Sequence, residues 1–228
     1  MNPIKIIVFL AVLSACVISC ADLFAGQEAL ETIFYDINHI GTSVYQNFGS
    51  IEFRGQKANL TIFKTDFPGF KDKEVIFSDG DTSIPFLVQR EIYIFFHNEN
   101  ITEEYSPRGH NFKLTKFEKG KKVEEYYIKG RGPIQNAILV PFSLRGSSGL
   151  RIGSSFNIIL PGEFTVKLSS IEDVTVPAGK FKSYHFRSEP PKFEIWISAD
   201  NARIPVKIKG LGGIPYALEM KKRVVSQR

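Results

Sequence analysis

Apolar and polar residues alternate along most of the chain beyond about residue 30, which is the pattern of half-buried β-strands. In residues 57–63, for example, Leu60 and Ile62 fall on one face while Thr61 and Phe63 fall on the other. Roughly ten or more segments of this kind follow one another, separated by Gly, Pro, Asn and Asp. The clearest are residues 31–41, 42–53, 84–98, 110–130, 155–160, 163–176, 182–189, 192–198, 204–210 and 214–220.

One stretch, residues 132–146, favours a helix. Pro133 suits a first helical position, and Ile134, Ala137 and Ile138 share a helical face. Pro141 limits that helix to about two turns. One short helix near 133–145 among many strands predicts an all-β, mainly antiparallel fold. We expect a strongly curved sheet that forms a barrel or half-barrel.

The first residues have the pattern of an export signal rather than of a structural element. A lysine and an apolar run that ends near Ser19 are followed by small residues, which predicts a signal peptide over 1–21. The motif Leu-Ser-Ala-Cys places Cys16 at the acylation position of a lipoprotein signal, and Cys20 is a second candidate. Ordinary cleavage after Ala21 is the alternative. Either way we expect export to the periplasm or outer membrane, lipid-anchored or soluble.

No linker or internal repeat divides the remaining chain, so residues 26–228 are predicted to form a single β-rich domain. Both cysteines lie in the signal segment, which leaves the mature domain without a disulfide or a thiol nucleophile. The net charge of +5 comes from interspersed charges, a pattern that does not indicate nucleic-acid binding. A weak affinity for anionic lipid headgroups stays open.

No catalytic, cofactor or metal site is indicated. The four histidines lack a His or Cys partner at metal-ligand spacing. The Gly- and Ser-rich residues 145–155 match neither a nucleophile elbow nor a phosphate loop. The adjacent carboxyls of Glu103 and Glu104 point to opposite faces of a strand, so they cannot act together. We therefore expect no enzyme and no cofactor.

Residues 194–208 predict two strands joined by a tight turn, with the chain's one tryptophan in the first strand. Asp200 and Arg203 belong to the turn, where Arg203 is expected to anchor the turn or to pair with Asp200. Trp196 falls on the charged face of the hairpin. There it must cover lysine stems, the short helix or the mouth of a cavity.

The C-terminal half resembles a family of exported bacterial proteins classed as domain of unknown function 3108. The resemblance rests on a helical segment ending in Leu-Arg, a Gly before a strand, a Pro-Ala-Gly turn and a Trp-Ser-Asp-Arg-Pro hairpin. Here these residues are Leu144, Arg145, Gly153, Pro177, Ala178, Gly179, Phe181, Trp196, Ser198, Asp200, Arg203 and Pro205. The resemblance spans nearly the whole mature chain and is most specific over 133–219.

The resemblance implies an exported, β-rich protein with a curved sheet similar to those of lipoprotein carriers and lipocalin-like binders. It brings no catalytic residues. It marks Trp196, Asp200, Arg203 and Pro205 as a ligand-facing or structural signature.

We expect a non-enzymatic envelope module that binds or carries a lipid or another apolar or amphipathic ligand. The alternatives are a structural or assembly lipoprotein that acts through protein contacts and, with less support, an envelope hydrolase. The pattern leaves open whether the interior is filled or hollow.

Overall fold

The structure is a computed structural model, and it describes residues 27–211 and 215–226. The predicted signal peptide, with Cys16 and Cys20, lies outside the described residues. Over the described ranges the strands form a single sheet of 14 members, all of whose pairings are antiparallel. The strands are β1 (Glu31–Ile37), β2 (Gly41–Phe53), β3 (Gln56–Phe67), β4 (Phe70–Ser78), β5 (Pro85–Ile94), β6 (His97–Tyr105), β7 (Asn111–Glu118), β8 (Lys121–Lys129), β9 (Ser155–Ile159), β10 (Glu163–Val176), β11 (Gly179–Glu189), β12 (Phe193–Ser198), β13 (Pro205–Gly210) and β14 (Tyr216–Val225).

The order of the strands across the sheet follows the chain in two runs. It is β8-β7-β6-β5-β4-β3-β2-β1-β14-β13-β12-β11-β10-β9, so β1 and β14 pair in the middle of the sheet. The two edges are β8 and β9, which are neighbours in the sequence. The residues between them must therefore cross from one edge of the sheet to the other.

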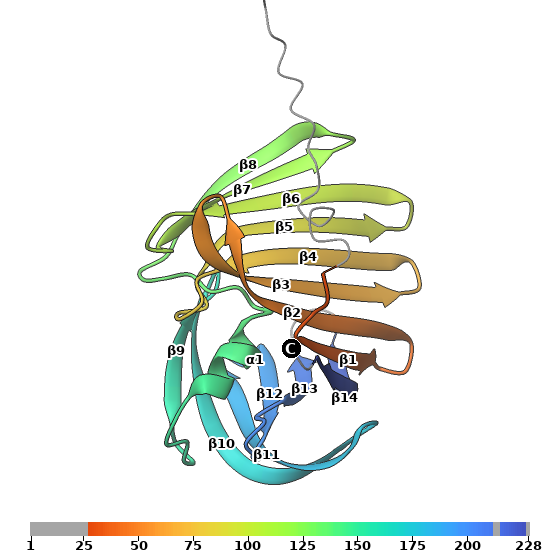
Figure 1. Ribbon diagram of the computed structural model, residues 1–228, viewed down its shortest axis with the longest axis vertical. Coiled ribbons are helices and arrows are strands. Elements are labelled where there is room, and N and C mark those ends of the chain that lie inside the picture. The colour runs from red at the N-terminus through yellow and green to blue at the C-terminus, as the bar shows by residue number, and fades with distance from the viewer. Residues whose placement is uncertain (1–26, 212–214, 227–228) are drawn as a thin grey trace, which may run out of the picture.

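The sheet is open and strongly curved, which confirms the predicted fold class. In Figure 1 the strands β3–β8 stack in the upper part while β9–β12 curve beneath them, with the helix α1 (Val140–Ser143) inside the curve. Register shifts interrupt several pairings, including those at Asn47/Gly49 and Leu168/Ser170. Such bulges add twist and bend the strand that carries them. Gly49 permits one of them, because its backbone has a φ of 72°.

The crossing segment, residues 130–147, joins the two edges through the interior. Ile134 donates its backbone N–H to Gly109 at 2.8 Å and forms a bridge with Ile159 of β9. Gln135 donates to the carbonyl of Ile159 at 2.7 Å. These bonds tie the start of β7 to β9 and hold residues 134–135 in an extended form, so the predicted helix does not begin at Pro133.

The helix α1 begins instead at Val140 and continues as a 3₁₀ turn, η2 (Leu144–Gly146). Pro141, which was expected to end a helix, lies in the first turn of this one. Proline is tolerated there because the first N–H groups of a helix have no intrahelical acceptor. The prediction of one short helix near 133–145 is thus confirmed, with a later start.

Side chains of the crossing segment fill part of the space that the sheet encloses. Phe142 stacks on Tyr45 of β2 with ring centroids 3.6 Å apart. Leu139 packs against Ile76 and Val88 from β4 and β5. On the other side Val140 and Leu144 pack against the apolar residues of β9–β12. Both halves of the sheet therefore bury apolar surface against the same short segment.

A buried ionic network fixes the end of this segment to the centre of the sheet. Arg145 contacts both carboxylate oxygens of Glu31 at 2.6 and 3.2 Å and donates to the carbonyl of Ala202 at 3.1 Å. Arg223 of β14 reaches the same carboxylate at 2.6 Å. Burial raises the pKa of Glu31, but hydrogen bonds and charges from the two arginines outweigh it, so the net pKa is lowered.

Replacing Arg145→Ala is expected to lower the free energy of unfolding by about 3 kcal/mol, because it leaves the buried Glu31 carboxylate with one partner fewer. Denaturant unfolding followed by circular dichroism measures this. The wild-type stabilisation is present above pH 4.5, the ordinary pKa of Glu31, and is lost as pH falls through the lowered folded value.

Arg131→Ala is the matched control, since the Arg131–Glu163 pair is solvent-exposed. It should cost less than about 1 kcal/mol. Equal losses in the two variants would contradict a special role for Arg145.

Candidate functional site

The space that the crossing segment leaves unfilled is a cavity of about 580 Å³. It lies against the inner face of β1–β7, where the register places Phe63, Glu74 and Arg90 beside one another on adjacent strands. Most of its wall is apolar. The apolar lining consists of Ile37, Ile40, Phe63, Phe67, Phe70, Phe112, Ala137, Ile138, Leu160, Pro161, Pro215 and Leu218.

Charged groups gather in one part of this cavity. The charged side chains in its lining are Asp72, Glu74, Arg90 and Glu103. Arg90 Nε lies 2.9 and 3.0 Å from the two carboxylate oxygens of Asp72, and its Nη2 lies 2.5 Å from Oδ2. This bidentate pair neutralises both partners. Two further carboxyl groups remain, from Glu74 and Glu103.

Glu74 is a buried carboxyl, with only 8 % of the residue exposed. Its Oε1 accepts a hydrogen bond from Asn136 Nδ2 at 2.6 Å, and its Oε2 lies 3.9 Å from Arg90 Nε. Burial is the largest influence on its pKa, and the charges of Asp72 and Glu103 act in the same direction. Asn136 and Arg90 oppose the shift but do not cancel it, so the pKa rises to about 7.

Two more polar groups lie beside this part of the cavity. Tyr105 donates its hydroxyl to Glu103 Oε2 at 2.7 Å, and burial raises the pKa of Glu103 above its ordinary value. The side-chain oxygen of Gln135 is buried and has no hydrogen-bond partner in the part of the chain that the structure describes. Gln135 belongs to the same lining as Glu74, but this oxygen is enclosed by protein atoms and does not open into the cavity.

The cavity opens between hairpin turns at one end of the sheet. Its exposed lining includes Ile40, in the β1–β2 turn, and Tyr216, at the start of β14. Nearby, Phe95 packs on Gly69 of the β3–β4 turn, and Phe96 is 92 % exposed. Exposed apolar and aromatic groups therefore lie in the cavity lining and on a hairpin turn beside it.

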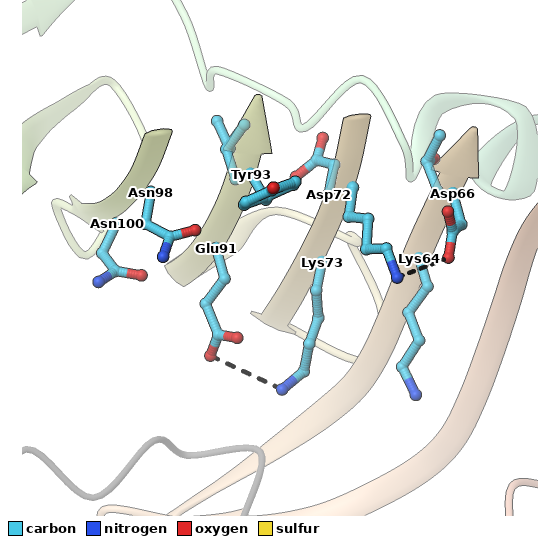
Figure 2. Close-up of a pocket in the computed structure, with 11 residues that line it drawn as sticks. Lys64, Asp66, Asp72, Lys73, Glu91, Tyr93, Asn98 and Asn100 are labelled. Atoms are coloured by element: carbon cyan, nitrogen blue, oxygen red, sulfur yellow. Dashed lines mark ion pairs between the residues drawn. The ribbon is translucent and has the colours of Figure 1, made fainter. Parts of the chain in front are cut away.

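A second hollow, of about 460 Å³, lies on the outer face of the same strands and is different in kind (Figure 2). Its side chains are mainly charged or polar, and they are paired with one another. Lys73 lies 3.6 Å from Glu91, and Lys71 lies 3.3 Å from Asp66. These pairs are solvated, and among the residues that line the groove only Ile92 and Tyr93 bring apolar or aromatic surface.

Trp196 does not line either hollow. It is 5 % exposed and stacks on His185, with ring centroids 4.1 Å apart. Its indole N–H donates to Glu172 at 2.7 Å, and the ammonium groups of Lys207 and Lys209 lie 5.9 and 5.5 Å from its ring. Trp196 also belongs to a buried apolar cluster with Val174, Ile204 and Val206. It is thus a core residue whose ring is contacted by His185 and by two lysine ammonium groups.

The other three signature residues shape the turn after β12. Asp200 Oδ1 accepts the backbone N–H of Ala202 and of Arg203, each at 3.1 Å. The Arg203 guanidinium donates to the carbonyl of Ser147 and, at 3.3 Å, to that of Arg145. Pro205 accepts the Tyr35 hydroxyl at 2.9 Å. None of the three lines the cavity.

One serine lies near a histidine on the face that carries Trp196. Ser170 Oγ is 3.4 Å from His185 Nδ1 and donates to Glu172 at 2.9 Å. Neither Ser170 nor His185 lines the cavity or the outer groove.

Within residues 27–211 and 215–226, no three His, Cys, Asp or Glu side chains come together as metal ligands. Over the same ranges no helix is long and apolar enough to cross a membrane.

Comparison with known proteins shows the fold and nothing finer. No protein-family model matches the chain, and no curated protein matches it. Among solved structures the chain is similar to a beta-barrel-like protein of domain of unknown function DUF1849 from Brucella abortus. The two share 12 % identity with a TM-score of 0.54, over 88 % of this chain and 99 % of that one.

At this identity the likeness establishes a β-barrel-like domain, similar to one of unknown function. The resemblance to domain of unknown function 3108 stays a prediction.

The polar residues of the cavity were not singled out from the sequence. Asp72 and Glu74 alternate with Lys71 and Lys73, so the strand looks charged on both faces. The available signal was that Arg90 shares its face of β5 with the apolar residues Val88 and Ile92. Which carboxyls meet it depends on the register of β4, β5 and β6.

Glu74→Gln is expected to stabilise the protein at pH 8. The folded pKa of Glu74 is raised from 4.5 to about 7, so this carboxyl's contribution favours folding most below pH 4.5 and falls as pH rises through 7. The amide removes that pH-dependent loss, worth about 3 kcal/mol above pH 7. Thermal unfolding at pH 4 and pH 8 measures the difference.

Glu104→Gln serves as the control, because Glu104 lies on the outer face and pairs with Lys113 at 2.7 Å. Its pH dependence should match the wild type. A Glu74→Gln variant with an unchanged pH profile would show that Glu74 ionises normally.

Proposed function

We propose that this protein is a non-enzymatic binding or carrier module that holds an amphipathic ligand in its interior cavity. The cavity itself carries the proposal. Its volume of about 580 Å³ lies within the usual range for ligand sites, and its wall is apolar with a few polar groups at one place. An apolar chain fits against Phe63, Phe67 and Phe70, while a polar group reaches Glu74 and Glu103.

We further propose that the module works in the bacterial cell envelope, facing the periplasm. Support comes from the sequence of residues 1–21, which has the arrangement of an export signal. Acylation of Cys16 would attach the domain to a membrane and bring the cavity close to lipids that could supply its ligand.

A structural or assembly role through protein contacts is the second candidate, and one observation favours it. Phe95 and Phe96 form an exposed aromatic turn, with 72 % and 92 % of their surfaces exposed, at the end of the β5–β6 hairpin. A hydrolase has less support, because neither Ser170 nor His185 lines the cavity or the outer groove.

The purified protein is expected to retain an apolar or amphipathic molecule, which native mass spectrometry followed by solvent extraction would identify. Ala137→Trp should remove it, because Ala137 lines the cavity and the indole would occupy that space. Val123→Trp is the control, since Val123 is exposed on β8 and does not line the cavity. A wild-type protein that binds no apolar molecule, even when one is added, would rule out the carrier role.

The fluorescence of Trp196 separates the cavity from the signature residues as the binding site. Ligand in the cavity should leave the emission of this tryptophan unchanged, because Trp196 is not in the lining. A shift in emission on ligand binding would instead support the ligand-facing interpretation of Trp196 and place the site on the His185 face.

Metabolic labelling with palmitate tests the lipid anchor. We expect the protein to be labelled in cells, and the label to be lost in Cys16→Ala. Retention in Cys16→Ala with loss in Cys20→Ala would identify Cys20 as the acylated residue. A wild-type protein that takes up no label would favour soluble secretion after cleavage at Ala21.

A further inference from the structure

We propose that the cavity selects ligands with a cationic, hydrogen-bond-donating head, of which a protonated long-chain amine is the simplest form. This inference rests on the proposed function and names the class of ligand that the cavity accepts. It follows from the balance of charges and of hydrogen-bonding groups in the lining.

The charged groups in the cavity lining are mainly acidic. The lining contains three carboxyl groups, from Asp72, Glu74 and Glu103, and one guanidinium, from Arg90. Arg90 directs two of its nitrogens at Asp72 within 3.0 Å, so this pair is satisfied internally. The two carboxyl groups that remain, from Glu74 and Glu103, make this part of the cavity acidic, although the net charge of the chain is +5. Above pH 7, where Glu74 is ionised, an anionic head placed here would meet like charge in a poorly solvated space, where the repulsion is strong.

The hydrogen-bonding groups in the lining also favour a ligand that donates hydrogen bonds. Asn136 directs its amide N–H at Glu74, and Tyr105 directs its hydroxyl at Glu103. The acceptor that remains for a ligand is Glu74 Oε2, whose contact with Arg90 Nε is long, at 3.9 Å. A buried acceptor without a donor costs free energy that a ligand donor would recover. An ammonium group has three donors and no acceptor, which suits this set.

The buried position of Glu74 in the cavity agrees with the binding of a cationic head. Its raised pKa of about 7 reflects burial first, together with Asp72 on its own strand and Glu103 on β6, against Arg90 on β5 and the neutral Asn136. A cationic head favours the ionised carboxylate. Binding of an amine should therefore release a proton near neutral pH and tighten as pH rises through about 7.

The test compares four ten-carbon ligands that differ only in the head: decylammonium, decyltrimethylammonium, decanol and decanoate. Each is titrated calorimetrically into delipidated protein at pH 8, below its micellar concentration. Decylammonium is expected to bind at least about tenfold more tightly than decanoate or decanol, as one charge-assisted hydrogen bond provides. Decyltrimethylammonium, which has the charge but no donor, should fall between decylammonium and decanol.

The variant Glu74→Gln/Glu103→Gln should lose at least about tenfold in affinity for decylammonium and keep its affinity for decanol. Glu104→Gln, on the outer face, should bind all four ligands as the wild type does. Thermal unfolding of each variant confirms that it is folded.

The outcomes separate this inference from the proposed function. Decanoate or decanol binding as tightly as decylammonium would overturn the cationic selectivity and leave the carrier role standing. An undiminished preference for decylammonium in the double variant would overturn the assignment to Glu74 and Glu103. If none of the four ligands binds the wild type, the carrier role fails and the inference fails with it.

Discussion

The architecture depends on the crossing of the chain between the two edges of its sheet. Each hairpin adds a strand beside the previous one, and the pairing of β1 with β14 places the first and the last strand in the middle of the sheet. The edges β8 and β9 are consecutive in sequence, so residues 130–154, which include the crossing segment, must pass between them. The sheet curls until strands near both edges approach the same segment. The bridge from Ile134 to Ile159 and the bond from Ile134 to Gly109 show that it does.

The crossing segment also determines how much of the interior remains hollow. Leu139, Phe142 and Leu144 fill the space toward both halves of the sheet. Before them, Gln135 and Asn136 line the space that remains, so the same segment is a plug on one side and a cavity wall on the other. The ion pair of Arg145 with Glu31 holds this plug in register with β1 and β14.

The cavity differs from an ordinary core in keeping charged groups where packing would favour apolar ones. The Arg90–Asp72 pair and the neighbouring Glu74 and Glu103 bring a desolvation cost that apolar residues of similar size would avoid. Sites where local stability is given up are often functional sites. The hairpin that carries Trp196 shows the opposite arrangement, since the indole N–H pairs with Glu172 and Trp196 lines neither the cavity nor the outer groove.

Much of the fold was predictable because alternation of apolar and polar residues is a local property. The strand and turn pattern, and the roles of Asp200 and Arg203 in a tight turn, follow from residue type and spacing. The start of the helix was not predictable, because hydrogen bonds from Ile134 and Gln135 to Gly109 and Ile159 override the local preference at Pro133. The contact of the Arg203 guanidinium with the loop at Ser147 could not be predicted either, because the two residues are 56 positions apart in the sequence.

By itself the sequence determined an all-β domain of antiparallel hairpins and the turn chemistry within each hairpin. The hairpins and their turns depend on residues that are close to one another along the chain. The tertiary structure decided which faces of those strands meet, and hence that Asp72, Glu74, Arg90 and Glu103 share one cavity while Trp196 lies outside it. The reason is physical: on a strand whose two faces are both polar, only pairing with other strands and the direction of curvature determine which side chains are enclosed.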